Sequence, residues 1–322
     1  MKRIGNLYEQ ITSLKNIQEA DTKAQKGKAN QYGVLLHNRN REGNLLMLQD
    51  MLASKTYSTS VYDIFTIHEP KERIVYKLPY FPDRIAHHAI MNVLEPVFVD
   101  TFTADTYSCI KKRGIHLLMR KLRHDLKDTE RTQYCLKFDI RKFYPNIDHD
   151  VLKSLLRRKF KDKDLLWLLD EIIDSAPGLP IGNYLSQYLA NFYLSYFDHW
   201  MKEQKHVKYY YRYADDIVIL HSDKSMLHSL FAEIKEYLYT LNLEIKNTHQ
   251  VFPVASRGID FVGYVFRHTH VKIRKQIKKN FARKMKSNPN HLCKASYLGW
   301  LSHCDSKHLI KKILPHAQLQ RL

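Results

Sequence analysis

Two β-prone runs flank a pair of adjacent acidic residues in the second half of the chain. The segment VKYYYRYADDIVIL, residues 207–220, is rich in aromatic and β-branched side chains except around Ala214, Asp215 and Asp216. Two such runs with a short polar break between them predict a β-hairpin that carries the acids at its tip. We therefore expect this part of the chain to form an antiparallel sheet.

A third acidic residue, Asp139, lies near the end of a short apolar strand predicted at residues 134–140. Adjacent carboxylates among aromatic and β-branched neighbours are costly unless cations neutralise them. Mg²⁺ prefers carboxylate oxygens, and two such ions stabilise the attacking and leaving oxygens of phosphoryl transfer. The pattern indicates a site for two Mg²⁺ ions at Asp139, Asp215 and Asp216. An ordinary turn is the alternative, because Asp is favoured in turns.

The elements around these acids predict an α+β fold. The expected order is a mainly helical segment in residues 1–65, a hairpin at 64–80, helices at 84–98 and 115–127, the strand at 134–140, helices at 150–157 and 164–174, a loop at 176–182, one long helix from about 185 to 200, the hairpin at 207–220, a helix at 224–241 and a strand or hairpin at 259–266. No internal repeat interrupts this order.

The formal net charge of +19 is spread unevenly. Residues 1–134 carry a net +6, residues 135–265 are neutral, and residues 266–322 carry +13. A neutral, aspartate-containing middle between basic flanks indicates a catalytic core whose neighbours hold phosphate backbones. A highly soluble basic surface is the alternative.

The remaining composition excludes several classes of protein. The four cysteines are widely spaced, so neither a disulfide scaffold nor a zinc module is expected. No apolar run approaches the length of a membrane span, and the segment MKRIGNLYEQ lacks the apolar core of a signal peptide. We therefore expect no membrane association and a cytoplasmic location.

The tetrad Tyr213-Ala214-Asp215-Asp216 resembles the metal-binding signature of reverse transcriptases, and further motifs follow in that family's order over about residues 64–305. The family fold is a right hand of fingers, a palm with an antiparallel sheet, and a short helical thumb. The resemblance implies an N-terminal extension and fingers in residues 1–134, a palm in 135–265 with interleaved fingers helices at about 150–175, and a thumb in 266–322. It also implies an RNA-directed DNA polymerase, a nucleotidyltransferase that binds template RNA, the RNA/cDNA duplex and deoxynucleoside triphosphates.

Two palm motifs add to the expected active site. The segment LKFDIRKFYPNID resembles the first palm motif, which makes Asp139 the third catalytic carboxylate and adds Ile140 to the metal-binding set. Tyr144 stands where the family keeps an aromatic gate against a ribose 2′-hydroxyl; a packed core aromatic is the alternative. The segment LNLEIKNT resembles the motif that places a lysine, here Lys246, near the pyrophosphate as general acid. A surface lysine is the alternative.

Residues of the fingers resemble the nucleotide-binding part of the family. In KERIVYKLPYFPDRI, Arg73 aligns with the phosphate-clamping arginine and Lys71 is a weaker candidate. An arginine fork suits phosphate oxygens, and a solvated hairpin charge is the alternative for both. In IGNYLSQ, the resemblance places Ile181, Gly182 and Gln187 at the nucleotide-binding motif that precedes the long palm helix.

The C-terminal region resembles a primer grip followed by a thumb. The segment IDFVGYVF resembles the primer grip, with Phe261, Gly263 and Tyr264 near the primer end; sheet packing alone is the alternative. The next helix has an apolar stripe four residues apart, which is expected to be core. The basic residues on its other faces are the expected nucleic-acid backbone contacts: Lys272, Lys275, Lys279, Arg283 and Lys286.

The segment IGNYLSQ also indicates a branch of the family. Most bacterial retroelement enzymes have Gln-Gly-x-x-x-Ser-Pro here, whereas this chain has Ile181 for the first Gln and Gln187 for the Pro. These departures resemble reverse transcriptases of diversity-generating retroelements, which copy a template-repeat RNA with misincorporation opposite adenine (mutagenic retrohoming) and work with a small accessory variability determinant protein. We expect the loss of a hydrogen-bonding side chain at position 181 to weaken selection between nucleotides. The alternative is that Ile181 only packs the palm and that the errors arise elsewhere.

Two other functions are compatible with these patterns. A reverse transcriptase of another bacterial lineage, such as an antiviral defence system, would share the chemistry without the mutagenic outcome. A catalytically inactive RNA-binding scaffold would share only the fold, and the intact set of three aspartates argues against it.

Overall fold

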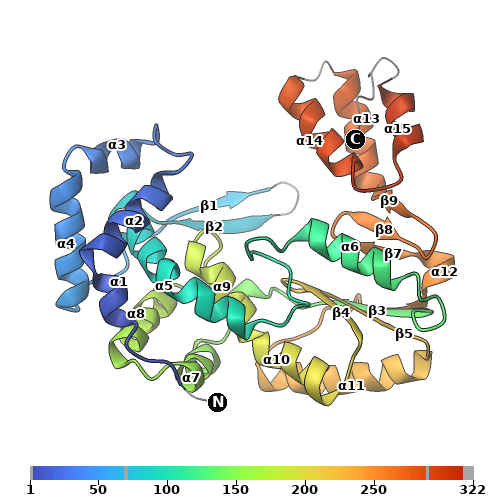
Figure 1. Cartoon of the computed structure of the whole chain (residues 1–322), viewed down its shortest axis with the longest axis horizontal. Coiled ribbons are helices and arrows are strands. Elements are labelled where there is room, and N and C mark those ends of the chain that lie inside the picture. Colours follow the sequence, from blue (N-terminus) through green and yellow to red (C-terminus); the bar gives the residue numbers. More distant parts are fainter. Residues whose placement is uncertain (1–2, 69–71, 288–289, 315–322) are drawn as a thin grey trace. The chain divides into compact units, whose positions relative to one another are not determined.

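The computed structural model of the chain (Figure 1) describes residues 3–68, 72–287 and 290–314. The chain divides into two compact units, each assembled from separate stretches of sequence. The first contains Met1–Thr103, Arg141–His199 and Tyr237–Glu244, and the second contains Ala104–Ile140, Trp200–Glu236 and Ile245–Leu322.

The first unit is mostly helical. Its elements are α1 (Tyr8–Thr12), α2 (Leu14–Gln25), α3 (Tyr32–Asn38), α4 (Arg41–Ala53), β1 (Asp63–Ile67), β2 (Arg73–Lys77), η1 (Tyr80–Arg84), α5 (Ile85–Thr101), η2 (Tyr144–Asn146), α7 (His149–Lys159), α8 (Lys163–Asp174), α9 (Tyr184–Tyr193) and α10 (Ser195–His199). Helix α5 is its central element, because α1, α2 and α9 all pack against it and most of its side chains are buried. The predicted hairpin is confirmed as β1 paired antiparallel with β2.

One carboxylate joins two helix starts in the first unit. Asp162 is the N-cap of α8, and its Oδ1 accepts the backbone N–H of Leu165 at 3.2 Å. Its Oδ2 accepts the N–H groups of Leu7 and Tyr8, at 2.8 and 3.0 Å. Burial alone would raise the pKa of Asp162, but these backbone donors hold it below its usual value. The N-terminal helix α1 is thus fixed to α8 by hydrogen bonds to one side chain.

The second unit contains two antiparallel sheets. Its elements are α6 (Ile115–Asp125), β3 (Tyr134–Asp139), η3 (Trp200–Gln204), β4 (Tyr209–Tyr213), β5 (Asp216–His221), β6 (Gln250–Pro253), α12 (Val254–Arg257), β7 (Ile259–Phe261), β8 (Tyr264–Phe266), β9 (Val271–Ile273), α13 (Lys275–Lys286), α14 (His291–Leu301) and α15 (Lys307–Ile313). Helix α11 (Lys224–Thr240) begins in this unit and ends in the first.

The larger sheet has the strand order β4-β5-β3-β6, with every neighbouring pair antiparallel. Side chains alternate between its two faces. On one face, Cys135 and Val218 join a core with Leu122 of α6. On the other face, Phe138 contacts Phe231 of α11, with 5.9 Å between ring centroids. The sheet is therefore covered by α6 on one side and α11 on the other, as Figure 1 shows, and the predicted antiparallel sheet is confirmed.

The prediction of one continuous helix from about 185 to 200 is wrong. Helix α9 ends at Tyr193, Leu194 has φ −93° and ψ 0°, and the chain continues as α10 and η3. The Ser195 hydroxyl donates to the Phe192 carbonyl at 2.7 Å. A serine that bonds to its own helix backbone in this way competes with the regular ladder, and helix ends of this kind leave little trace in the apolar periodicity.

The C-terminal helices α13, α14 and α15 enclose a small core of their own. Phe281, Leu301 and Ile310 are buried there, and Ile277 and Met285 pack partly buried against them. The prediction that the apolar stripe of α13 is core is therefore confirmed. Among the described residues, no helix combines the length and the apolar character needed to cross a membrane.

Burial of His87 makes the stability of the first unit depend on pH. His87 lies in α5, only 2% exposed, and its Nε2 has no hydrogen-bond partner among the described residues. Burial lowers the pKa of His87 to about 4. The unfolded chain would take up this proton near the ordinary histidine pKa of about 6.5. The contribution of uncharged His87 to the unfolding free energy is therefore fully present above about pH 6.5 and is lost as the pH falls toward 4.

We predict that His87→Leu removes about 2 kcal/mol of the loss in unfolding free energy between pH 7.5 and pH 5, because leucine binds no proton. Urea unfolding at the two pH values measures this change. His228→Leu, at an exposed position, is measured beside it as the control for exchanging a histidine for leucine. A His87→Leu protein with the wild-type pH dependence would contradict the prediction.

Candidate active site

Two of the three predicted aspartates face each other across a strand pair in the second unit. Asp139 is the last residue of β3, Asp216 is the first of β5, and the register pairs them directly. Asp215 lies in the turn between β4 and β5, after Ala214, whose φ is +55°. The Asp215 carbonyl accepts the N–H of Ile140 at 3.2 Å, which ties the turn to the end of β3. The structure thus brings together residues that are distant in sequence.

Negative charge is concentrated at this pair. The Oδ1 atoms of Asp139 and Asp216 are buried, and no hydrogen bond from a described residue satisfies either. Instead, each faces a lysine. Lys246 Nζ forms an ion pair with Asp139, and Lys137 Nζ lies 3.5 Å from Asp216 Oδ1. Burial raises the pKa of Asp216 to about 6; Lys137 opposes the rise, and the charges of Asp139 and Asp215 add to it.

The donor set fits a hard cation. Buried carboxylate oxygens that lack hydrogen bonds and repel one another are stabilised by positive charge, which the two ammonium groups supply here. In the structure as it stands, the described residues contain no group of three or more His, Cys, Asp or Glu side chains close enough to hold a metal ion. Mg²⁺ therefore remains a proposal that rests on the chemistry of these oxygens.

Lys137 is a site residue that the sequence patterns did not single out. Its side chain lies on the same face of β3 as Asp139, because residues two apart on a strand share a face. Its Nζ also donates to the Asp260 carbonyl and lies 5.8 Å from the centre of the Phe261 ring. A charged residue two positions before Asp139 in an otherwise apolar strand was the signal that could have identified it.

Ile181 and Gly182 lie against strand β2 in the first unit. The Ile181 carbonyl accepts the N–H of Tyr76 at 2.8 Å. Gly182 has φ +127°, and a Cβ at this position would lie 2.2 Å from the Tyr76 carbonyl oxygen. Only glycine permits this approach, so the residue is needed to seat β2.

The other predicted nucleotide-binding residues also belong to the first unit. Tyr144 begins η2, half-buried, and its ring contacts Phe143 with 5.6 Å between centroids. Arg73 is exposed at the start of β2, and Gln187 is exposed on α9. Lys71 lies outside the described residues.

The predicted primer-grip residues form a tight turn between β7 and β8. Phe261 and Tyr264 are buried, and the Tyr264 hydroxyl donates to the Trp300 carbonyl at 2.9 Å. Gly263 has φ +92°, and a Cβ there would lie 2.5 Å from the Trp300 ring. The side chains of Phe261 and Tyr264 therefore support the turn from inside the core.

The five residues of the thumb that are predicted to contact the nucleic-acid backbone are all exposed: Lys272, Lys275, Lys279, Arg283 and Lys286.

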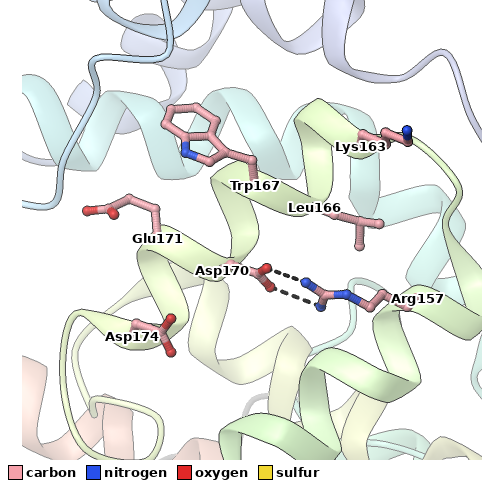
Figure 2. A pocket seen from close by; sticks show the side chains of 7 residues that line it. All are labelled: Arg157, Lys163, Leu166, Trp167, Asp170, Glu171 and Asp174. Carbon is pink, nitrogen blue, oxygen red and sulfur yellow. Dashed lines mark hydrogen bonds and ion pairs between the residues drawn. The ribbon is translucent and has the colours of Figure 1, made fainter.

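A pocket of about 470 Å³ lies between α7 and α8 (Figure 2). Arg157 pairs with both carboxylate oxygens of Asp170, at 3.2 and 2.5 Å, and Trp167 lines the same hollow. Every lining residue belongs to the first unit, whereas the three aspartates belong to the second. The pocket therefore shares no lining residue with the carboxylate site.

Residues 68–266 match the family model described as reverse transcriptase (RNA-dependent DNA polymerase). Protein YkfC of Escherichia coli is 22% identical over 233 residues, which cover 58% of this chain and 61% of that protein. The group II intron-encoded protein LtrA of Lactococcus lactis is 24% identical over 139 residues, which cover 40% of this chain and 23% of that protein. The match thus spans less than two thirds of the length of these relatives.

Two solved telomerase structures have a similar fold. The telomerase of Candida albicans in complex with a fragment of telomeric RNA aligns with a TM-score of 0.52 at 12% identity, covering 82% of this chain and 58% of that one. The apo telomerase of Candida tropicalis gives 0.51 at 12% identity, covering 71% and 52%. At this level of identity the likeness concerns the fold alone, and it confirms the expected α+β right-hand polymerase fold.

We predict that Gly182→Ala lowers the unfolding free energy by about 2 kcal/mol or more beyond the cost of its backbone conformation, because the new Cβ would collide with the Tyr76 carbonyl. Gly114→Ala is a close control: Gly114 has φ +129°, and a Cβ there would meet nothing within 4 Å. Chemical denaturation of the two variants measures the difference. Equal losses would show that the contact with β2 contributes nothing.

Proposed function

Because the chain belongs to the reverse transcriptase (RNA-dependent DNA polymerase) family, we propose that it extends a primer by copying an RNA template with deoxynucleoside triphosphates. The observation that carries this proposal is the direct pairing of Asp139 with Asp216, next to Asp215 in the adjoining turn. Carboxylates held in this way suit a reaction whose catalysis is mainly positioning and charge neutralisation.

The proposed reaction assigns a role to each residue of the carboxylate site. The 3′-hydroxyl oxygen of the primer attacks the α-phosphorus and gives up its proton to water. The bond between the α-phosphorus and the oxygen that bridges to the β-phosphate breaks, and pyrophosphate leaves. Asp139, Asp215 and Asp216, with Ile140, would hold two Mg²⁺ ions, which supply positive charge to the phosphate oxygens. Lys246, whose ammonium already lies at Asp139, would donate a proton to the leaving pyrophosphate.

We assign substrate binding to the remaining predicted residues. Tyr144 would exclude a ribose 2′-hydroxyl and so favour deoxynucleotides. Arg73 and Lys71 would bind the triphosphate, which suits the exposure of the Arg73 guanidinium. We propose that residues 1–134 form the fingers, 135–265 the palm and 266–322 the thumb. The exposed lysines of the thumb would contact the nucleic-acid backbone.

We further propose that the enzyme serves a diversity-generating retroelement. Ile181 and Gln187 support this assignment, because Ile181 presents no hydrogen-bonding side chain to a nucleotide. The template would then be a template-repeat RNA, and an accessory variability determinant protein would be a partner. A reverse transcriptase of another lineage is the alternative, and the similarity to a group II intron-encoded protein is compatible with it. Sequencing the RNA that co-purifies from the native locus separates the two.

We predict that Asp139→Asn reduces primer extension on an RNA template by about 1,000-fold or more, because a neutral amide has no negative charge with which to hold Mg²⁺. The double change Asp215→Ala with Asp216→Ala should abolish it. The exposed Asp150→Asn on α7 is the control and should retain wild-type activity. Wild-type protein that makes no cDNA with its own RNA and accessory protein would favour the scaffold function instead.

We predict that Ile181→Gln lowers misincorporation opposite adenine by about 2- to 10-fold, because the restored amide adds one polar contact to the nucleotide. Sequencing of cDNA made by the two proteins measures the error spectrum. Ile181→Leu, which stays apolar, should keep the wild-type errors. An unchanged spectrum in Ile181→Gln would remove the support that this residue gives to the retroelement assignment.

A further inference from the structure

Residues 105–108 run alongside strand β4 and extend the edge of the catalytic sheet. The N–H of Arg212 donates to the Asp105 carbonyl at 3.0 Å, and the N–H of Tyr107 donates to the Arg212 carbonyl at 3.1 Å. Thr106 pairs with Arg212 in parallel orientation. This segment precedes β3 in sequence, yet it reaches the last residues of β4, immediately before the turn that carries Asp215.

Two side chains hold the backbone of that turn. Ala214 has φ +55°, a conformation that costs a residue with a Cβ about 1 kcal/mol or more. Its N–H donates to Ser108 Oγ at 3.1 Å, and its carbonyl accepts from Arg212 Nη1 at 3.2 Å. Both polar groups of Ala214 are therefore occupied, one by each side chain.

Both of these side chains are fixed in place. Arg212 is fully buried, and its Nη2 also lies 3.4 Å from Thr106 Oγ1. Ser108 is 2% exposed and follows directly on the residues that pair with β4. A hydrogen bond to a buried, well-anchored side chain restricts the turn more than one to a mobile surface side chain would.

We propose that Ser108 is a positioning residue for the catalytic carboxylates, acting through Ala214. Its hydroxyl accepts the Ala214 N–H and thereby holds the left-handed turn, which fixes the direction in which Asp215 leaves β4. The inference rests on the proposed function for the identity of the reaction and for the cations that the carboxylates would hold.

A positioning role and a packing role for Ser108 predict different results when its hydroxyl is removed. If Ser108 only fills space, its loss lowers stability and leaves cation affinity unchanged. If its hydroxyl holds the turn, its loss weakens cation binding at Asp215 while the α6 and α11 faces of the sheet stay intact. We expect the affinity for the cation to fall about 3- to 10-fold, which corresponds to the free energy of one hydrogen bond.

The test compares Ser108→Ala, Ser108→Thr and the control Ser195→Ala. Ser195 is also buried, but its hydroxyl donates to the Phe192 carbonyl, and both residues belong to the first unit. Mn²⁺ binding to the free protein is measured by electron paramagnetic resonance, the Mg²⁺ concentration for half-maximal primer extension by kinetics, and Tm by thermal unfolding. We expect Ser108→Ala to weaken both cation readouts about 3- to 10-fold with a Tm within a few degrees of wild type, Ser108→Thr to restore them, and Ser195→Ala to leave them unchanged.

Three results would overturn the inference: wild-type cation binding in Ser108→Ala, failure of Ser108→Thr to bind better than Ser108→Ala, or a fall in Tm of more than about 10 °C that accompanies the loss. Wild-type protein that binds Mn²⁺ but extends no primer would overturn the proposed function instead, and the Mn²⁺ titration would still decide the role of Ser108.

Discussion

The antiparallel pairing of β3 with β5 is the interaction on which the rest of the site depends. It places Asp139 opposite Asp216 and puts Lys137 on the same face as both. A register shift of one residue would turn these groups toward α11 and bring apolar side chains to the site. The cores against α6 and α11 therefore fix the chemistry as well as the fold, since each requires the opposite set of alternating residues.

Local patterns sufficed for much of this architecture. The β4–β5 hairpin could be predicted because two runs of aromatic and β-branched residues flank a short polar break, and α13 because its apolar residues recur four apart. The end of α9 at Tyr193 could not, since Leu194 and Ser195 are both compatible with a helix and only a side-chain hydrogen bond marks the break.

The carboxylates of the site were predictable, but the groups that hold them were not. Asp139, Asp215 and Asp216 stand out as acids among apolar neighbours. Ser108 is brought to the turn by a pairing of segments about 100 residues apart, which no local pattern encodes. Gly182 was expected at the nucleotide, whereas its glycine character is explained by close approach to Tyr76. Long-range contacts of this kind appear only once the register of the strands is known.

Lys137 has a consequence for how the parts of the second unit influence one another. One ammonium group attracts the Asp216 carboxylate and also serves the Asp260 carbonyl and the Phe261 ring of β7. In the proposed function, a cation bound at Asp216 would replace the ammonium of Lys137 and leave it available to β7. Thermodynamic reciprocity then requires that whatever strengthens the hold of Lys137 on β7 also favours that cation. Asp216 and strand β7 would thus be energetically coupled through a single side chain.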